Sequence, residues 1–377
     1  MDDHATHEPP LWLLQTGQCG DDVQGLALGE ALGRAFTVKP ARDADSLVPP
    51  WPAVVISAGR HGEAAVRELR RRAGTAPVRF VHVGRPYRSH AREFDLVVTT
   101  PDYRVPPAPN VLEIPLPLHR VTPARLAEGR RRWGPCLTHL PAPYVALLVG
   151  GAGSGRYSLD RTVALRLARA ASGLAARRGG SLLVTTSHRT PPGVADALEA
   201  RLTAPSAFHR WRPGLADDNP YFGYLGLASE VVVTGDSVSM LAEAAATGRP
   251  VHLFDLEPRG AEALLSCRDL LVWVRTRLHE AAQSCLPRRL RRDIRVIHAR
   301  LLAGGRVVRL GEGAVRTSAA LPDYGPAVAE RVLGLLASGP VTIIRSVGDR
   351  PRSATVRWAL RRLPGPPTPA RAAGTAA

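Results

Sequence analysis

A loop in the second half of the chain combines hydroxyl and carboxylate side chains in an order that suits a phosphate-bearing ligand. Residues 231–233 are valines, typical of a strand buried on both faces of a parallel sheet. Asp236, Ser237 and Ser239 follow as helix-capping side chains. A helix N-terminus at the carboxyl end of such a strand favours an anion, and Glu243, further along the helix, can accept a hydrogen bond from a sugar hydroxyl. The alternative is that Asp236 only caps a helix and Glu243 lies on its solvated face.

Two more loops are expected at the same edge of this sheet. The strand predicted at residues 144–149 leads into a glycine-rich turn that begins with Gly150 and Gly151, and glycines let backbone amides crowd an oxyanion. The strand predicted at residues 181–185 leads into Ser187, Arg189 and Thr190. The carboxyl ends of parallel strands meet at one edge, so we expect these loops to lie beside the Asp236 loop.

Another loop, expected in the first domain, follows the strand predicted at residues 11–14. Its glycines make a turn, and Asp21 or Asp22 is expected to cap the helix behind it. Asp21 is our candidate general base, with Asp22 next. The glycine spacing does not fit the Rossmann dinucleotide fingerprint, and the chain has no Walker loop. A plain strand–turn–helix without a ligand is the alternative.

Several of these segments resemble a known family. N-P-Y-F-G-Y-L, followed by T-G-D-S-V-S-M-x-x-E-A-x-x-T-G-R-P-V, resembles the bacterial branch of the mitochondrial-fission Elm-type family, and the first loop shares G-D-x-x-Q followed by G-L-A-x-x-x-A-L-G. The family is similar in fold to GT-B glycosyltransferases. The resemblance extends from about Leu11 to Leu256 by motif, with His188 standing where family members usually carry an arginine.

The resemblance implies a metal-independent glycosyltransferase whose donor is a nucleotide-sugar, with no further cofactor. Arginines, helix N-termini and amides can stabilise a diphosphate leaving group without a metal, and the expected loops contain no D-x-D pair. A nucleotide-sugar epimerase and a non-catalytic peripheral scaffold that recruits a protein partner remain as alternatives. The residues expected to bind the nucleotide or diphosphate are Gly17, Gly20, Gln24, Arg60, Gly150, Gly151, Ser187, Arg189, Thr190, Asn219, Tyr221, Thr234, Asp236, Ser237, Ser239, Met240 and Glu243.

Strands alternating with helices predict an α/β protein of two Rossmann-like domains, with parallel sheets facing a cleft. We expect an N-terminal domain on the acceptor side over residues 1–135 and a nucleotide-binding domain over residues 136–340. Residues 130–143 change composition abruptly and are interpreted as the linker. A C-terminal extension follows at residues 341–377, with a disordered tail from about residue 363, where Pro, Gly and Ala dominate.

Composition indicates the compartment and the kind of partner. The 377 residues carry a formal charge of +17, nearly all of the positive charge being arginine, which partly reflects coding bias. A basic surface suits nucleotide diphosphates or anionic lipid, whereas no nucleic-acid motif appears. Four scattered cysteines and the lack of a signal sequence or long apolar run predict a cytoplasmic protein, membrane-associated at most peripherally. Residues 286–302 predict a basic amphipathic helix, which either lies on an anionic membrane or packs against a domain.

Overall fold

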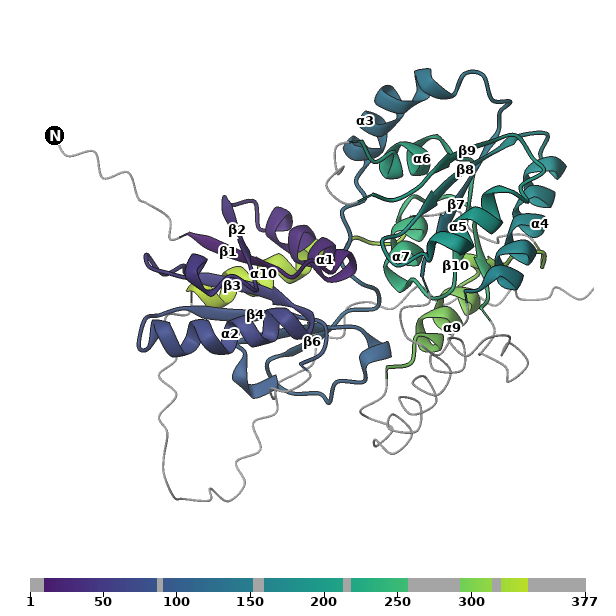
Figure 1. Cartoon of the computed structure of the whole chain (residues 1–377). Helices are drawn as coiled ribbons and strands as arrows, with labels where there is room; N and C mark the ends of the chain where they lie inside the picture. Colours follow the sequence, from purple (N-terminus) through teal and green to yellow (C-terminus); the bar gives the residue numbers. More distant parts are fainter. Residues whose placement is uncertain are drawn as a thin grey trace, which may run out of the picture. The chain divides into compact units, whose positions relative to one another are not determined.

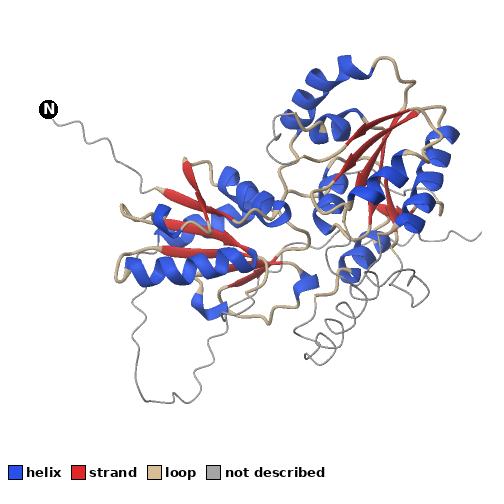
Figure 2. Cartoon of the chain, in the orientation of Figure 1, coloured by secondary structure: helices blue, strands red, loops and turns tan. Residues whose placement is uncertain are grey.

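The computed structural model describes residues 10–86, 91–151, 159–212, 218–256, 292–313 and 320–337. Within these residues the strands form two separate six-stranded sheets (Figure 1). Every strand pairing in both sheets is parallel. Helices connect the strands and cover the sheets, as Figure 2 shows. The predicted fold class, two Rossmann-like α/β domains, is therefore confirmed.

The first sheet has the strand order β2-β1-β3-β4-β5-β6. Buried side chains of helices α1 and α10 (Gly325–Ala337) lie in the core on one face, and those of α2 lie in a second core cluster. β2, an edge strand, was not predicted. The elements are β1 (Leu11–Gln15), α1 (Cys19–Ala31), β2 (Phe36–Pro40), β3 (Val54–Ala58), α2 (Gly59–Ala73), β4 (Arg79–Val83), β5 (Leu96–Thr99) and β6 (Val111–Glu113).

The second sheet has the strand order β12-β11-β10-β7-β8-β9. The strands β10, β7 and β8 are therefore neighbours, and the three predicted loops begin at their carboxyl ends, along one edge of the sheet. The elements are β7 (Tyr144–Val149), α4 (Arg161–Arg177), β8 (Ser181–Thr186), α5 (Pro192–Glu199), β9 (Ser206–His209), α6 (Tyr221–Leu227), β10 (Glu230–Thr234), α7 (Val238–Ala246), β11 (Val251–Phe254), α9 (Arg295–Ala303) and β12 (Val307–Arg309).

The last described helix, α10 (Gly325–Ala337), packs on the first sheet although it follows the second in the chain. Val328 and Val332 are fully buried there, in one cluster with Leu11 and Leu28. From chain order alone, the sequence predicts these residues in the second domain, because an apolar helix face does not indicate which sheet it packs on. The domain boundaries themselves stay a prediction.

The segment interpreted as a linker begins inside a helix. Residues 123–133 form α3 (Pro123–Trp133), and a single 3-10 turn follows. The helix has a regular start, since the Thr122 hydroxyl accepts a hydrogen bond from Arg125 N at 3.2 Å and Pro123 occupies the first turn. The run of arginines at 130–132 therefore lies in the last turn, where cations favour the helix dipole.

Part of the predicted basic amphipathic helix is described. Ile294, Ile297 and Leu301 are buried in the core of the second sheet, so the apolar side of this part packs against the domain. Residues 286–291 and the extension at 341–377 lie outside the described residues. Among the helices that are described, none combines the length and apolar character needed to cross a membrane.

A buried carboxylate, that of Glu230, lies where β10 begins. Glu230 is 7% exposed and its carboxylate accepts hydrogen bonds from Arg178 and, at 2.7 Å, from His252 Nε2. Burial alone raises the pKa of Glu230, but the hydrogen bonds from Arg178 and His252 bring it below its usual value. Its contribution to stability is therefore present at neutral pH and is lost as the pH falls through the lowered pKa.

We expect Glu230→Ala to lower the free energy of unfolding by about 1–3 kcal/mol at neutral pH, since His252 would keep a buried ring without its acceptor. The matched control is Glu199→Ala, an exposed glutamate paired with Arg210, which should change stability by less than about 1 kcal/mol. Urea unfolding of both variants is the measurement. Equal losses in the two variants would contradict this assignment.

Candidate functional site

Hydrogen bonds join the three loops at the carboxyl edge of the second sheet. Gly150 N donates to Thr234 Oγ1 at 2.8 Å, and Gly151 N donates to Asp236 Oδ2 at 2.7 Å. From the third loop, the Thr190 hydroxyl donates to Gly150 O at 2.6 Å. The loops predicted to meet at this edge therefore do so.

Both glycines are required by close packing. A Cβ on Gly150 would lie 2.4 Å from an Asp236 carboxylate oxygen, and one on Gly151 would lie 2.2 Å from the Arg189 carbonyl carbon. The sequence predicts that their amides face an oxyanion. Both N–H groups instead donate within the protein, so these glycines allow the loops to approach one another.

The N-terminus of α7 (Val238–Ala246) presents backbone amides that can donate to a ligand. Ser237 is its N-cap and accepts from Met240 N at 3.4 Å, which leaves the amides of the first two helical residues without an intrahelical partner. In the described part of the chain, the Ser239 hydroxyl has no hydrogen-bond partner. Arg189 is exposed and likewise forms no ion pair with a described residue. The arrangement suits an anion bound at the helix end.

Glu243 is buried in the same helix, at 6% exposure. The Tyr221 hydroxyl donates a hydrogen bond to its Oε2, whereas no described residue donates to Oε1. Burial raises the pKa of Glu243 to about 7, against the opposing effects of the Tyr221 hydrogen bond and the charge of Arg120. Asn219 acts locally, since its Oδ1 accepts from Tyr221 N at 3.0 Å where α6 begins.

Asp22 holds the first loop in shape. Its carboxylate accepts from Thr16 N at 2.7 Å, from the Thr16 hydroxyl at 2.8 Å and from Gly17 N at 2.9 Å. Gln24 Nε2 donates to Gly20 O at 3.3 Å, and Gly17 has a φ of 76°, which favours glycine. The expectation that Asp21 or Asp22 caps α1 is wrong, because the N-cap is Gln18 and the Asp22 carboxylate turns back to the loop.

The Asp21 carboxylate is differently placed. No described residue donates a hydrogen bond to it, and a Cβ on Gly59 would lie 2.0 Å from its Oδ2, so the carboxylate rests on the start of α2 beside the exposed Arg60. Burial raises the pKa of Asp21, while the charges of Arg292 and Arg189 work against that rise. Of the two aspartates, Asp21 has the geometry of a candidate base.

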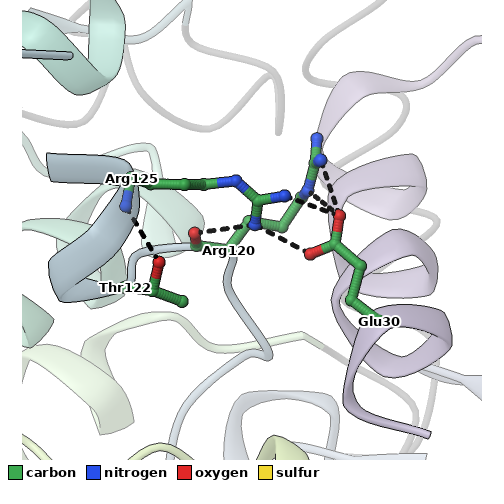
Figure 3. Close-up of polar contacts among 4 residues, drawn as sticks. All are labelled: Glu30, Arg120, Thr122 and Arg125. Atoms are coloured by element: carbon green, nitrogen blue, oxygen red, sulfur yellow. Dashed lines mark hydrogen bonds and ion pairs between the residues drawn. The ribbon is translucent and has the colours of Figure 1, made fainter. Parts of the chain in front are cut away.

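Two arginines that matter were missed in the sequence. Arg292 Nε donates to buried Asp102 at 2.7 Å and places a charge near Asp21. Arg120 donates to Glu30 Oε1 through Nη2 at 2.6 Å, and Arg125 reaches the same carboxylate at 2.8 Å (Figure 3). Arg292 lies in an arginine-rich run and Arg120 in a proline-broken segment, and neither belongs to a motif that predicts its contacts.

Two aromatic rings, those of His188 and Trp211, lie near the end of β8. The rings of His188 and Trp211 meet edge to face, with centroids 5.7 Å apart, and burial lowers the pKa of His188. Among the described residues, no group of three or more His, Cys, Asp or Glu side chains is placed to hold a metal ion.

Comparison with known families identifies the chain's relatives. The profile of the family described as Mitochondrial fission ELM1 matches residues 19–272, more than half of the chain. The chain belongs to this family. The Mitochondrial fission protein ELM1 of Arabidopsis thaliana is 30% identical over 225 residues, which are 54% of this chain and 51% of that protein. The chain thus spans about half the length of that relative. An uncharacterised protein, RP120, of Rickettsia prowazekii is 25% identical over 29% of this chain and 31% of its own length.

Solved structures with a related arrangement are also known. The UDP-GlcNAc 2-epimerase of Neisseria meningitidis aligns over 87% of this chain and 99% of its own, with a TM-score of 0.45 and 12% identity. The ADP-heptose lps heptosyltransferase II of E. coli aligns over 72% and 99%, with a TM-score of 0.41 and 11% identity. No function follows from likenesses at this level.

Asp21 and Asp22 differ in the hydrogen bonds they accept, and this difference can be measured in the free energy of unfolding. Asp22→Ala should lower the free energy of unfolding by about 1–3 kcal/mol, because three donors lose their acceptor. Asp21→Ala, which removes no hydrogen bond to a described residue, should change it by less than about 1 kcal/mol. Urea denaturation of the two variants is the measurement, and a larger loss for Asp21→Ala would reverse the assignment.

Proposed function

We propose that this chain is a metal-independent, GT-B-like glycosyltransferase whose donor is a nucleoside-diphosphate sugar, with uridine or guanosine as the nucleoside. The observation that carries the proposal is the edge formed by β7, β8 and β10, where Ser239 and the α7 N-terminus lie one helical turn from the buried Glu243. A cationic end and a buried acceptor on one helix match the two chemically different halves of a nucleotide.

The spacing along α7 supports this assignment. Ser239 and Glu243 are four residues apart on one helix, so their side chains lie on the same side at about 5–6 Å. A phosphate at the N-terminus, held by Ser239 and the Arg189 guanidinium, places the attached ribose within reach of Glu243 Oε1, to which no described residue donates. Hydroxyl donors of a ribose supply the hydrogen bond that this oxygen lacks.

The chemistry of transfer assigns roles to the remaining groups. As the glycosidic bond breaks, charge grows on the diphosphate, and a helix N-terminus and arginine stabilise that charge. The acceptor hydroxyl must lose a proton, and Asp21 is the carboxylate we assign to take it. A pKa raised by burial makes Asp21 a stronger base than an exposed aspartate. Asp22, with its oxygens already bonded, positions the loop.

Family membership supports a second candidate, a non-catalytic scaffold in membrane division, because the Arabidopsis relative is named a mitochondrial fission protein. Such a scaffold would work through a protein partner or an anionic membrane. An epimerase is a further alternative, and it needs the same nucleotide-sugar. Nucleotide-sugar binding followed by product analysis distinguishes the three, since transfer, epimerised product and no binding are different outcomes.

Glu243→Ala should weaken binding of UDP or GDP by about 1–3 kcal/mol, because a ribose hydroxyl loses its acceptor. Isothermal titration calorimetry measures the change in dissociation constant. Glu199→Ala is again the control, because Glu199 lies on α5 with an exposed side chain. An unchanged dissociation constant in the Glu243 variant would remove this residue from the nucleotide site.

Asp21→Asn keeps the size of the side chain and removes the base. Turnover with a nucleotide-sugar and its acceptor should fall by about 10²–10⁴-fold, with little change in UDP affinity. Initial rates and titrations on the same preparation are the measurement. Loss of UDP binding in a folded variant would make Asp21 a binding residue, and unchanged turnover would place the base elsewhere.

A further inference from the structure

The hydrogen bond between Tyr221 and Glu243 engages one of the two carboxylate oxygens of Glu243. The sequence suggested that both residues contact the ligand. In the structure the Tyr221 hydroxyl donates to Glu243 Oε2, and so it is committed to the protein. No described residue donates to the other oxygen of Glu243, Oε1, which can therefore accept from a ligand.

We propose that Tyr221 is a positioning residue that holds Glu243 by one oxygen and makes nucleotide binding at this subsite depend on the ionisation of Glu243. This inference rests on the proposed function. The hydrogen bond fixes the carboxyl group and stabilises its charged form, which is the better acceptor for a ribose hydroxyl. Tyr221 itself is held by Asn219, whose Oδ1 accepts from the Tyr221 amide.

Two groups from different elements act on the ionisation of Glu243, a neutral hydroxyl donor and a charged guanidinium. Tyr221 lies on α6, and Arg120 lies on the segment before α3. The Arg120 guanidinium is itself held by Glu30, which Arg125 also contacts (Figure 3). Arg120 therefore lowers the pKa of Glu243 from a fixed position and leaves Tyr221 as the sole described donor to its carboxylate.

Burial raises the pKa of Glu243 by more than Tyr221 and Arg120 lower it, and the resulting pKa is about 7. The folded protein holds this proton more tightly than the unfolded chain does. Glu243 therefore favours folding at low pH, and that contribution is lost as the pH rises through about 7. Ligand binding has the opposite dependence, because the ionised carboxylate accepts the hydroxyl hydrogen bond.

The test compares wild type with Tyr221→Phe, Glu243→Gln and Tyr224→Phe. Tyr224 is the matched control, a buried tyrosine on the same helix whose hydroxyl has no hydrogen bond to a described residue. For wild type we expect UDP affinity to rise by about tenfold between about pH 6 and about pH 8. The increase should be reduced in Glu243→Gln to the part due to UDP's own ionisation, and should move to higher pH in Tyr221→Phe.

Thermal unfolding of the nucleotide-free variants over the same pH range tests the pair alone. Tyr221→Phe should lose more stability than wild type as the pH rises, Tyr224→Phe should follow wild type, and Glu243→Gln should show a weaker dependence. Matching pH profiles for Tyr221→Phe and wild type overturn this inference, and the proposed function survives if wild type binds UDP. A wild type that binds neither UDP nor GDP removes the proposed function, and this inference with it.

Discussion

The hydrogen bonds from Gly150 N to Thr234 and from Gly151 N to Asp236 hold the carboxyl ends of β7 and β10 together, and the candidate site depends on them. They form only because no side chain separates the loops at positions 150 and 151. Asp236 Oδ2 therefore accepts a hydrogen bond from the backbone of the neighbouring loop. Ser237, rather than Asp236, is the side chain that caps α7.

Burial of a carboxyl group is the second constraint on this site. An ionised Glu243 is unfavourable in the interior, and one hydrogen bond from Tyr221 does not remove that cost. Asp22 shows the contrast, since three donors surround its carboxylate and hold a loop. A buried acceptor with an unused oxygen costs stability and is expected where a ligand completes the hydrogen bonding.

Local features of the sequence predicted much of the second sheet. The valine run of β10 and the serine cap of α7 are short-range signals, and parallel topology then brought the loops to one edge. The distinction between Asp21 and Asp22 was not predictable, because it depends on a loop that folds back onto one carboxylate. Arg120 and Arg292 act on residues about a hundred positions or more away, and α10 finds its partner across the whole second domain. Such long-range packing leaves no periodic pattern in the sequence.

The most direct test of the central claim is a crystal structure of the full chain soaked with UDP. We expect the phosphates at the α7 N-terminus, in contact with Ser239 and Arg189, and a ribose hydroxyl that donates a hydrogen bond to Glu243 Oε1. Tyr221 should remain on the other oxygen of that carboxylate. UDP bound at another edge of the sheet, or a ribose that makes no contact with Glu243, would contradict it.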